Sequence, residues 1–199
     1  MPKGEETAVQ APMRAKDRIF EAARDLFYEK GIRAVGVDEV VEKAGVTKPS
    51  LYRAFGSKDE LVAACLTDNV KLFWSWWEEV CAPHAGDGRA QIRALFGSLA
   101  EKLASPSHRG CPLTNAAVEF PEPDHPGRKV TEEHKARLRA RFRELARDAG
   151  ARDADVLGDA LMMLMEGAEC TSQTLPASDG GRADVAAAAE ALVRAFTGR

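Results

Sequence analysis

The stretch that decides the fold is residues 40–61, which read VVEKAGVTKPSLYRAFGSKDEL. Its first part has apolar residues spaced for one helix face, and Gly45 then supplies the backbone freedom that a helix end and a tight turn need. Thr47 is suited to the N-cap of a second helix. Leu51 and Phe55 stand four residues apart and can face inward. The stretch therefore predicts two short helices joined by a turn, which is the helix-turn-helix design.

The second helix of this unit leaves polar and basic groups on its outer surface. These are Thr47, Lys48, Ser50, Tyr52 and Arg53. Ser57 and Glu60 then form a Ser-x-x-Glu capping box that starts the next helix. The segment 43–58 contains four cations and no acid, on a protein whose formal net charge is −3. This is the pattern of a small nucleic-acid-binding patch on a larger body with another role.

Length and composition limit the class of protein. A chain of 199 residues with 45% apolar residues can form one or two domains with a real core. No apolar run approaches the roughly 20 residues of a membrane span, and the first residues lack a signal-peptide core. We therefore expect a cytoplasmic protein with no membrane partner. Its cysteines are then expected as thiols: Cys65, Cys81, Cys111 and Cys170.

The remaining periodicity is helical, with no strand-like alternation and no repeat, so the predicted fold class is all-α. Helices are expected at about 13–30, 37–44, 47–55, 57–80, 89–104, 112–120, up to 149 after the turn at 121–126, at 154–172 and at 181–197. We expect three regions. They are a disordered tail at 1–12, a helix-turn-helix domain at 13–60, and a helical effector-binding and dimerisation domain at 61–199.

The last two expected helices are amphipathic and rich in alanine. One stripe carries Leu157, Leu161, Leu164 and Ala168, and the other carries Val185, Ala189, Leu192 and Phe196. Such a pair suggests a four-helix packing between two subunits. Ordinary core packing within one subunit gives the same pattern, so both interpretations stay open.

Ordered motifs within 14–62 carry a family resemblance. Gly31 closes the first helix and is followed by AGVTK at 44–48, LYRAF at 51–55 and SKDEL at 57–61. In this order and spacing they resemble the DNA-binding domain of the TetR/AcrR family of transcriptional repressors. The segment from Gly110 to Glu119 is similar to a multidrug-type, YxaF/LmrA-like branch of that family. Gly36 departs from the Thr or Ser that the family commonly has there, so the phosphate contact usually made at this position lacks its side chain.

The resemblance implies a homodimer that reads an inverted repeat in double-stranded operator DNA. Thr47, Lys48, Pro49 and Ser50 would lie at the end of the recognition helix that enters the major groove. Hydroxyl and ammonium groups there can donate to phosphates or base edges. Tyr52 and Lys58 would bond phosphates, and Arg53 is a further candidate. The alternatives are solvated surface for the cations and a core position for the tyrosine.

The second domain would then sense a small apolar or aromatic effector. A shift of the fourth helix would change the separation of two recognition helices, which must lie about 34–36 Å apart to dock together. The candidate pocket residues are Phe73, Trp74, Trp77, Phe96, Leu99, Asn115, Phe120, Met162, Met165 and Glu166. Plain core packing is the alternative for each. A buried Glu166 needs a partner, either an arginine or a cationic ligand, unless it faces solvent.

Three other interpretations compete with this one. Cys81, His84, His108 and Cys111 could form a Cys₂His₂ metal site or a thiol-responsive one. An enzyme is not expected, because the sequence has no Gly-x-Ser-x-Gly, phosphate loop, dinucleotide fingerprint or His-Glu-x-x-His motif. No cofactor is expected either. A DNA-binding protein without a ligand is the third alternative.

Overall fold

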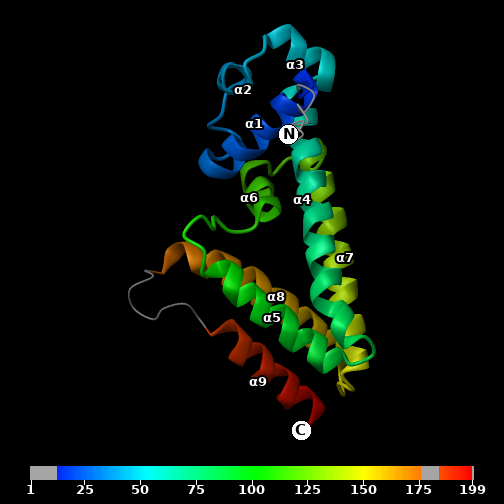
Figure 1. The fold of residues 1–199 in the computed structure, drawn as a ribbon. Helices are drawn as coiled ribbons and strands as arrows, with labels where there is room; N and C mark the ends of the chain where they lie inside the picture. The colour runs from blue at the N-terminus through cyan, green and yellow to red at the C-terminus, as the bar shows by residue number, and fades with distance from the viewer. Residues whose placement is uncertain (1–12, 176–183, 199) are drawn as a thin grey trace, which may run out of the picture.

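The structure is a computed structural model that describes residues 13–175 and 184–198. The predicted disordered tail at 1–12 lies outside these residues. Every regular element within them is a helix, so the all-α prediction is confirmed (Figure 1). The helices are α1 (Ala15–Lys30), α2 (Val37–Ala44), α3 (Lys48–Phe55), α4 (Lys58–Cys81), the 3₁₀ turn η1 (Ala82–His84), α5 (Gly88–Leu103), α6 (Pro112–Glu119), α7 (Pro126–Asp148), α8 (Ala154–Thr174) and α9 (Val185–Thr197).

Helices α1 to α3 form a compact unit at one end of the molecule, which we call the N-terminal unit (Figure 1). Its core is mostly aliphatic and includes Ile19, Val35 and Leu51, all fully buried, together with the ring of Phe27. The same core takes in Leu61 from α4 and Leu113 from α6. The unit is thus packed against two further helices, α4 and α6.

The turn between α2 and α3 has the geometry that its sequence requires. Gly45 adopts the left-handed conformation, with φ 61° and ψ 44°, which costs a glycine little. The amide of Val46 donates to the carbonyl of Val41 at 3.0 Å and so closes the end of α2. Thr47 stands at the N-cap of α3 with extended backbone, but its side chain makes no capping bond. Its hydroxyl lies 3.0 Å from that of Ser50 instead.

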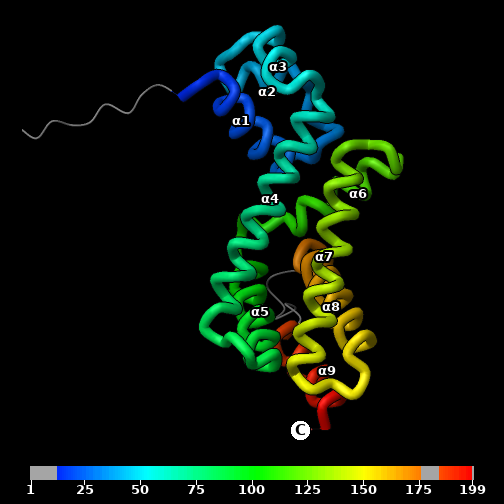
Figure 2. The backbone as a smooth tube through the Cα atoms, turned by 90° about the vertical axis from the view of Figure 1, so that its right-hand side faces the viewer, coloured from blue at the N-terminus to red at the C-terminus, as the bar shows by residue number. Residues whose placement is uncertain are grey.

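Helix α4 connects the N-terminal unit to the rest of the chain. The hydroxyl of Ser57 accepts from the amide of Glu60 at 3.1 Å, so the Ser57 half of the predicted capping box is present. Figure 2 shows α4 descending from the unit beside α7, toward the helices α5, α8 and α9. No helix among the described residues is long and apolar enough to cross a membrane.

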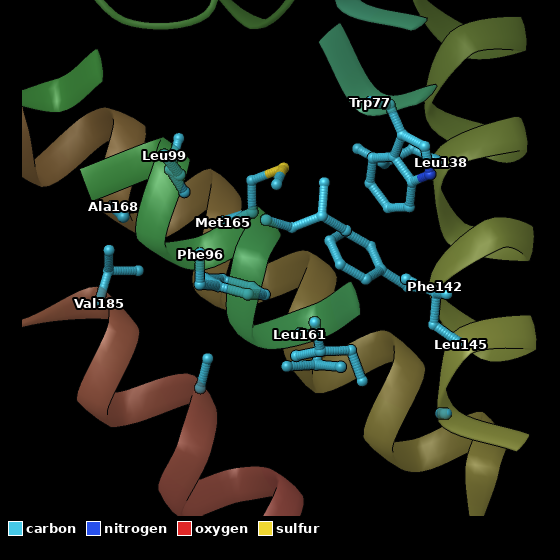
Figure 3. Close-up of a cluster of buried hydrophobic side chains, with 14 of the residues drawn as sticks. Trp77, Phe96, Leu99, Leu138, Phe142, Leu145, Leu161, Met165, Ala168 and Val185 are labelled. Carbon is cyan, nitrogen blue, oxygen red and sulfur yellow. The ribbon is translucent and has the colours of Figure 1, made fainter. Parts of the chain in front are cut away.

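The lower part of α4 joins α5, α7, α8 and α9 in a second assembly, which we call the C-terminal body. Its core is rich in aromatic rings, and Figure 3 shows side chains from these helices converging on it. Trp77, Phe96 and Phe142 are fully buried, with ring centroids 5.1 Å apart between Trp77 and Phe142. Gly158 lets α8 approach α7 closely, because a Cβ there would lie 2.7 Å from the backbone nitrogen of Arg143.

The stripes predicted to face a partner lie mostly inside the subunit. Buried in the core of the C-terminal body are Leu157, Leu161, Ala168, Val185 and Ala189. The alternative of core packing within one subunit is therefore correct for these residues. The outer faces of the same helices remain exposed, with Val156 and Met163 on α8 and Ala187, Ala188, Ala191 and Ala195 on α9.

Candidate DNA-binding surface and ligand cavity

The outer surface of α3 is free where the sequence predicts contact with DNA. Exposed there are Thr47, Lys48, Pro49, Tyr52 and Arg53, while Ser50 is half-buried. Tyr52 has 49% of its surface exposed, so the alternative of a core aromatic is wrong. Leu51, on the opposite side, is fully buried and holds α3 against the unit. The arrangement leaves hydroxyls and cations on one accessible helix face.

Lys48 is occupied by a neighbouring carboxylate in the free protein. Its Nζ lies 2.7 Å from Oδ1 of Asp38, and both side chains are largely exposed. The hydrogen bond to Asp38 raises the pKa of Lys48 above its usual value, and the charge of Asp38 adds to this. The lysine is therefore fully charged at neutral pH. A phosphate that reaches it must compete with Asp38.

Lys58 points into the protein. Its Nζ donates to the carbonyl of Ile32 at 2.7 Å and lies 5.9 Å from the centroid of the Phe27 ring. Burial lowers the pKa of Lys58. This side chain therefore fastens the turn between α1 and α2 to α4, and a phosphate contact would require it to leave that carbonyl.

A cavity of about 430 Å³ lies where the N-terminal unit meets the C-terminal body. Drug-sized ligands occupy cavities of about 300–1,000 Å³. Its apolar wall contains Leu72, Phe73, Leu113, Leu138 and Met165. The polar lining is Arg24, Asp25, Tyr28 and Glu29 of α1, Asn69 of α4, Lys102 of α5, His108, Gly110, Cys111 and Pro112 around the start of α6, His134 and Lys135 of α7, and Glu166 and Glu169 of α8.

Two pairs of ionisable side chains lie in the cavity wall. The Nζ of Lys135 lies 2.5 Å from Oε1 of Glu166, and the hydroxyl of Thr114 donates to the other oxygen at 2.7 Å. Nε2 of His108 lies 2.8 Å from Oε2 of Glu169, and burial raises the pKa of that glutamate. The predicted need of Glu166 for a partner is thus met by a lysine and a threonine.

His134 is the most buried polar group of the cavity wall, with 3% of its surface exposed. Its ring meets Phe73 edge to face, with centroids 4.8 Å apart. Nδ1 has no hydrogen-bond partner in the described structure. Burial, and then the charge of Lys135, lower the pKa of His134 to about 4. The ring is therefore neutral at physiological pH.

The predicted pocket residues divide into three groups. Phe73, Met165 and Glu166 line the cavity. Trp74, Trp77, Phe96, Leu99 and Met162 belong to or pack on the core of the C-terminal body and do not line it. Asn115 lines a neighbouring cavity of about 30 Å³, and Phe120 stacks on His125 with centroids 4.0 Å apart. Most of the large aromatic side chains lie in the core, because burying their large apolar area away from water lowers the free energy of the folded state the most.

The polar wall contributed by α1 and α7 was not predicted from the sequence. On α7, Thr131 and His134 are buried in the same helical register as Leu138, Phe142 and Leu145. Because Thr131 and His134 continue this apolar stripe, the sequence of α7 indicates a buried polar site. The contribution of α1, including Tyr28, had no such signal, because it depends on how the two assemblies meet.

The predicted metal site is not formed. Cys81 and His84 lie before α5, and His108 and Cys111 lie after it. A helix of this length spans about 24 Å, which is far beyond the reach of shared ligands or of a disulfide. No group of three or more metal-binding side chains occurs within 13–175 and 184–198. Burial also raises the pKa of Cys81 to about 11, so this thiol is unreactive. The metal-site interpretation is wrong.

Comparisons with known proteins match both halves of the chain. Residues 19–65 match the family model described as "Bacterial regulatory proteins, tetR family". Residues 88–180 match the model described as "Tetracyclin repressor-like, C-terminal domain". The predicted YxaF/LmrA-like branch stays a prediction.

Individual proteins agree with these models. The activator FasR of Mycolicibacterium smegmatis is 42% identical over 79 residues, which are 40% of this chain but only 36% of that protein. The repressor KstR2 of Rhodococcus jostii is 27% identical over 161 residues, 79% of this chain and 74% of that one. The solved structure of SCO4454, a TetR-family regulator from Streptomyces coelicolor, superposes with a TM-score of 0.85 at 28% identity, covering 92% of this chain and 96% of that chain. The chain therefore belongs to the TetR family of bacterial transcriptional regulators, which bind DNA through a helix-turn-helix.

Proposed function

We propose that the chain is a ligand-responsive repressor. It binds a palindromic operator as a homodimer and releases it when a small apolar or aromatic molecule enters the cavity of about 430 Å³. The observation that carries the proposal is the position of this cavity, which touches both the N-terminal unit and the C-terminal body. As a regulator that binds bacterial DNA, it would act in the cytoplasm.

The DNA arm of the proposal is supported by the exposed end of α3. Thr47, Lys48, Pro49 and Ser50 lie on its first turn, the part of a recognition helix that enters the major groove. Tyr52 and Arg53 follow on the exposed face and can reach phosphates. Repression is supported by the name of the relative KstR2, whereas FasR is named an activator.

The homodimer is supported by the outer face of α8 and α9. Met163 is 67% exposed and Val156, about two turns away on the same face of α8, is 51% exposed, which is unusual for apolar side chains on one stripe. The exposed alanines of α9 offer a smooth surface beside them. Two copies could bury these faces in a four-helix packing across a twofold axis.

The ligand arm is supported by the mixed lining of the cavity. One wall is apolar, and Lys135, Glu166, His108 and Glu169 place charged or polar groups around it. An occupant that contacts α4 at Phe73 and α1 at Tyr28 would favour one arrangement of the two assemblies over another. It would then shift the distance between the paired recognition helices.

The test begins with selection of duplexes from a random DNA pool by the purified protein. The enriched duplex is then used in fluorescence anisotropy, and aromatic and apolar compounds are screened by thermal shift. We expect an inverted repeat, and at least one stabilising compound that weakens its binding. Failure to enrich any sequence would refute the DNA arm. Enrichment without any compound that both stabilises the protein and releases the duplex would refute the ligand arm alone.

A further inference from the structure

The turn between α1 and α2 is held by a carboxylate from another part of the chain. One oxygen of Glu119 accepts from the amide of Ile32 at 3.0 Å, and the other accepts from the amide of Arg33 at 2.6 Å. Lys58 donates to the carbonyl of Ile32 from the opposite side. Charge-assisted bonds of this kind are stronger than neutral ones. Glu119 is the last residue of α6, so α6 grips the N-terminal unit at this point.

A second grip lies at the other end of α6. The hydroxyl of Tyr28, on α1, accepts from the amide of Arg109 at 2.8 Å and lies 3.4 Å from the carbonyl of Gly110, to which it donates. These residues directly precede α6. The amide side chain of Asn115 braces the same segment by donating to the carbonyl of Arg109 at 3.0 Å. Both ends of this short helix are therefore bonded to the N-terminal unit.

The same segment forms the cavity wall. Tyr28, Gly110, Pro112 and Leu113 all line the cavity, and the smaller cavity beside it reaches Glu119. Helix α6 has eight residues and spans about 12 Å. Movement at its first turn therefore reaches its last turn as the displacement of a short rigid rod.

We propose that Glu119 is the positioning residue that couples the cavity to the recognition helix. An occupant at the Tyr28 end displaces the 109–113 segment, α6 follows, and the Glu119 carboxylate leaves the amides of Ile32 and Arg33. The turn that leads into α2 and α3 is then free to change its orientation. This rests on the proposed function, and it assigns the regulation to α6 in addition to α4.

The coupling can be tested without an effector, because linkage is reciprocal: if the cavity influences DNA binding, DNA binding influences the cavity. The probe is the duplex enriched from the random pool. Amide hydrogen exchange is followed by mass spectrometry in peptides that cover residues 106–116, with and without saturating duplex. In the wild-type protein we expect exchange in these peptides to change by about fivefold or more on DNA binding.

Glu119→Gln keeps the size of the side chain but replaces one acceptor oxygen with an NH₂ group. It should reduce the response of residues 106–116 to near zero, measured at a duplex concentration that saturates the variant. The matched control is Glu122→Gln, since the Glu122 carboxylate lies nearby and accepts from the guanidinium of Arg33 at 3.4 Å, with no bond to a backbone amide in the described part of the chain. The control should keep the wild-type response. Tyr28→Phe removes only a hydroxyl and should abolish the response too, which keeps the test open if Glu119→Gln does not fold.

A full response in a folded Glu119→Gln protein would overturn the proposal, as would an equal loss in Glu122→Gln. So would a wild-type protein that binds the duplex with no change at residues 106–116. If instead the wild-type protein enriches no duplex at all, the proposed function itself fails. The two failures are therefore distinguishable.

Discussion

The N-terminal unit and the C-terminal body are both built from amphipathic helices, but they differ in the composition of their cores and in where their polar groups lie. The unit is built from three helices around mostly aliphatic side chains, and the polar and basic groups proposed to contact DNA point outward on α3. The body is built around aromatic side chains, and the cavity at its junction with the unit is lined by partly buried ionisable and polar groups and by the buried His134. The unit needs a fixed outer surface. In the proposed function, the body needs an interior surface that responds to an occupant, and it keeps polar groups there at a cost to stability.

The largest expected effect tests the core of the body. Trp77→Ala removes a fully buried indole that contacts Phe142. We expect the free energy of unfolding to fall by about 3–5 kcal/mol, through lost burial and the cavity left behind. Urea unfolding followed by circular dichroism measures it. A loss below about 1 kcal/mol would mean that the aromatic core does not hold the body together.

The next prediction concerns the polar wall of the cavity. The pKa of His134 is lowered from 6.5 to about 4 in the folded state by burial, so the unfolded chain takes up the proton first as the pH falls. The contribution of His134 should leave stability unchanged above about pH 7, lower it progressively between pH 6.5 and 4, and level off below. The full loss is about 3 kcal/mol.

Stability measured against pH in His134→Gln isolates this contribution from that of the carboxylates. The difference between the two proteins should vary across the window from pH 6.5 to 4. A constant difference would show that His134 has the same pKa in the folded and the unfolded chain, and therefore that its ring is hydrated in the folded protein.

The outer face of the body provides the third prediction. Met163→Glu places a charge on the exposed stripe of α8, and a charge buried without a partner at a subunit interface is strongly unfavourable. We expect monomers by sedimentation and about 100-fold weaker binding of the selected duplex. Val118→Glu is the control, since Val118 is 78% exposed on α6, away from this stripe. Equal dimerisation of both variants would place the interface elsewhere.

The smallest effect belongs to the N-terminal unit. Lys48→Ala should weaken binding of the duplex several-fold and reduce the slope of log affinity against log salt by about one. Asp38→Asn should do the opposite, because it frees Lys48 from its partner at 2.7 Å. Affinity and salt dependence that are unchanged in Lys48→Ala would exclude a phosphate contact, and relaxed sequence preference would indicate a base contact instead.

The two regions also differ in how far their sequence predicts them. The bounds of α2 and the ends of α3 follow from Gly45, Gly56 and the Ser57 cap, which act within a few residues of their own position. In the body, the helices were predictable but the cavity was not. Trp77 and Phe96 have the same helical spacing of apolar residues as Phe73. Which of these rings faces the cavity depends on how the surrounding helices pack: α1, α4, α6, α7 and α8. The partner of Glu166 was not predictable either, because Lys135 lies on a different helix, α7.

The two faces of α8 and α9 also could not be assigned from the sequence alone. The apolar stripe of Leu157 and Leu161 identified these helices as amphipathic, but one helix here has a buried face and a second, weaker apolar face. Periodicity reports the strongest face. The face proposed for a partner carries the exposed Val156 and Met163, and only the packed structure distinguishes these two residues from the core.

The central claim is that two copies of the N-terminal unit read one inverted repeat at a fixed separation. The most direct measurement inserts about five base pairs, half a helical turn, between the half-sites of the selected duplex. The two half-sites then lie on opposite sides of the DNA. Binding should weaken by about 100-fold and recover in part when a full turn of about ten base pairs is inserted. Affinity that does not depend on the spacing would contradict the claim.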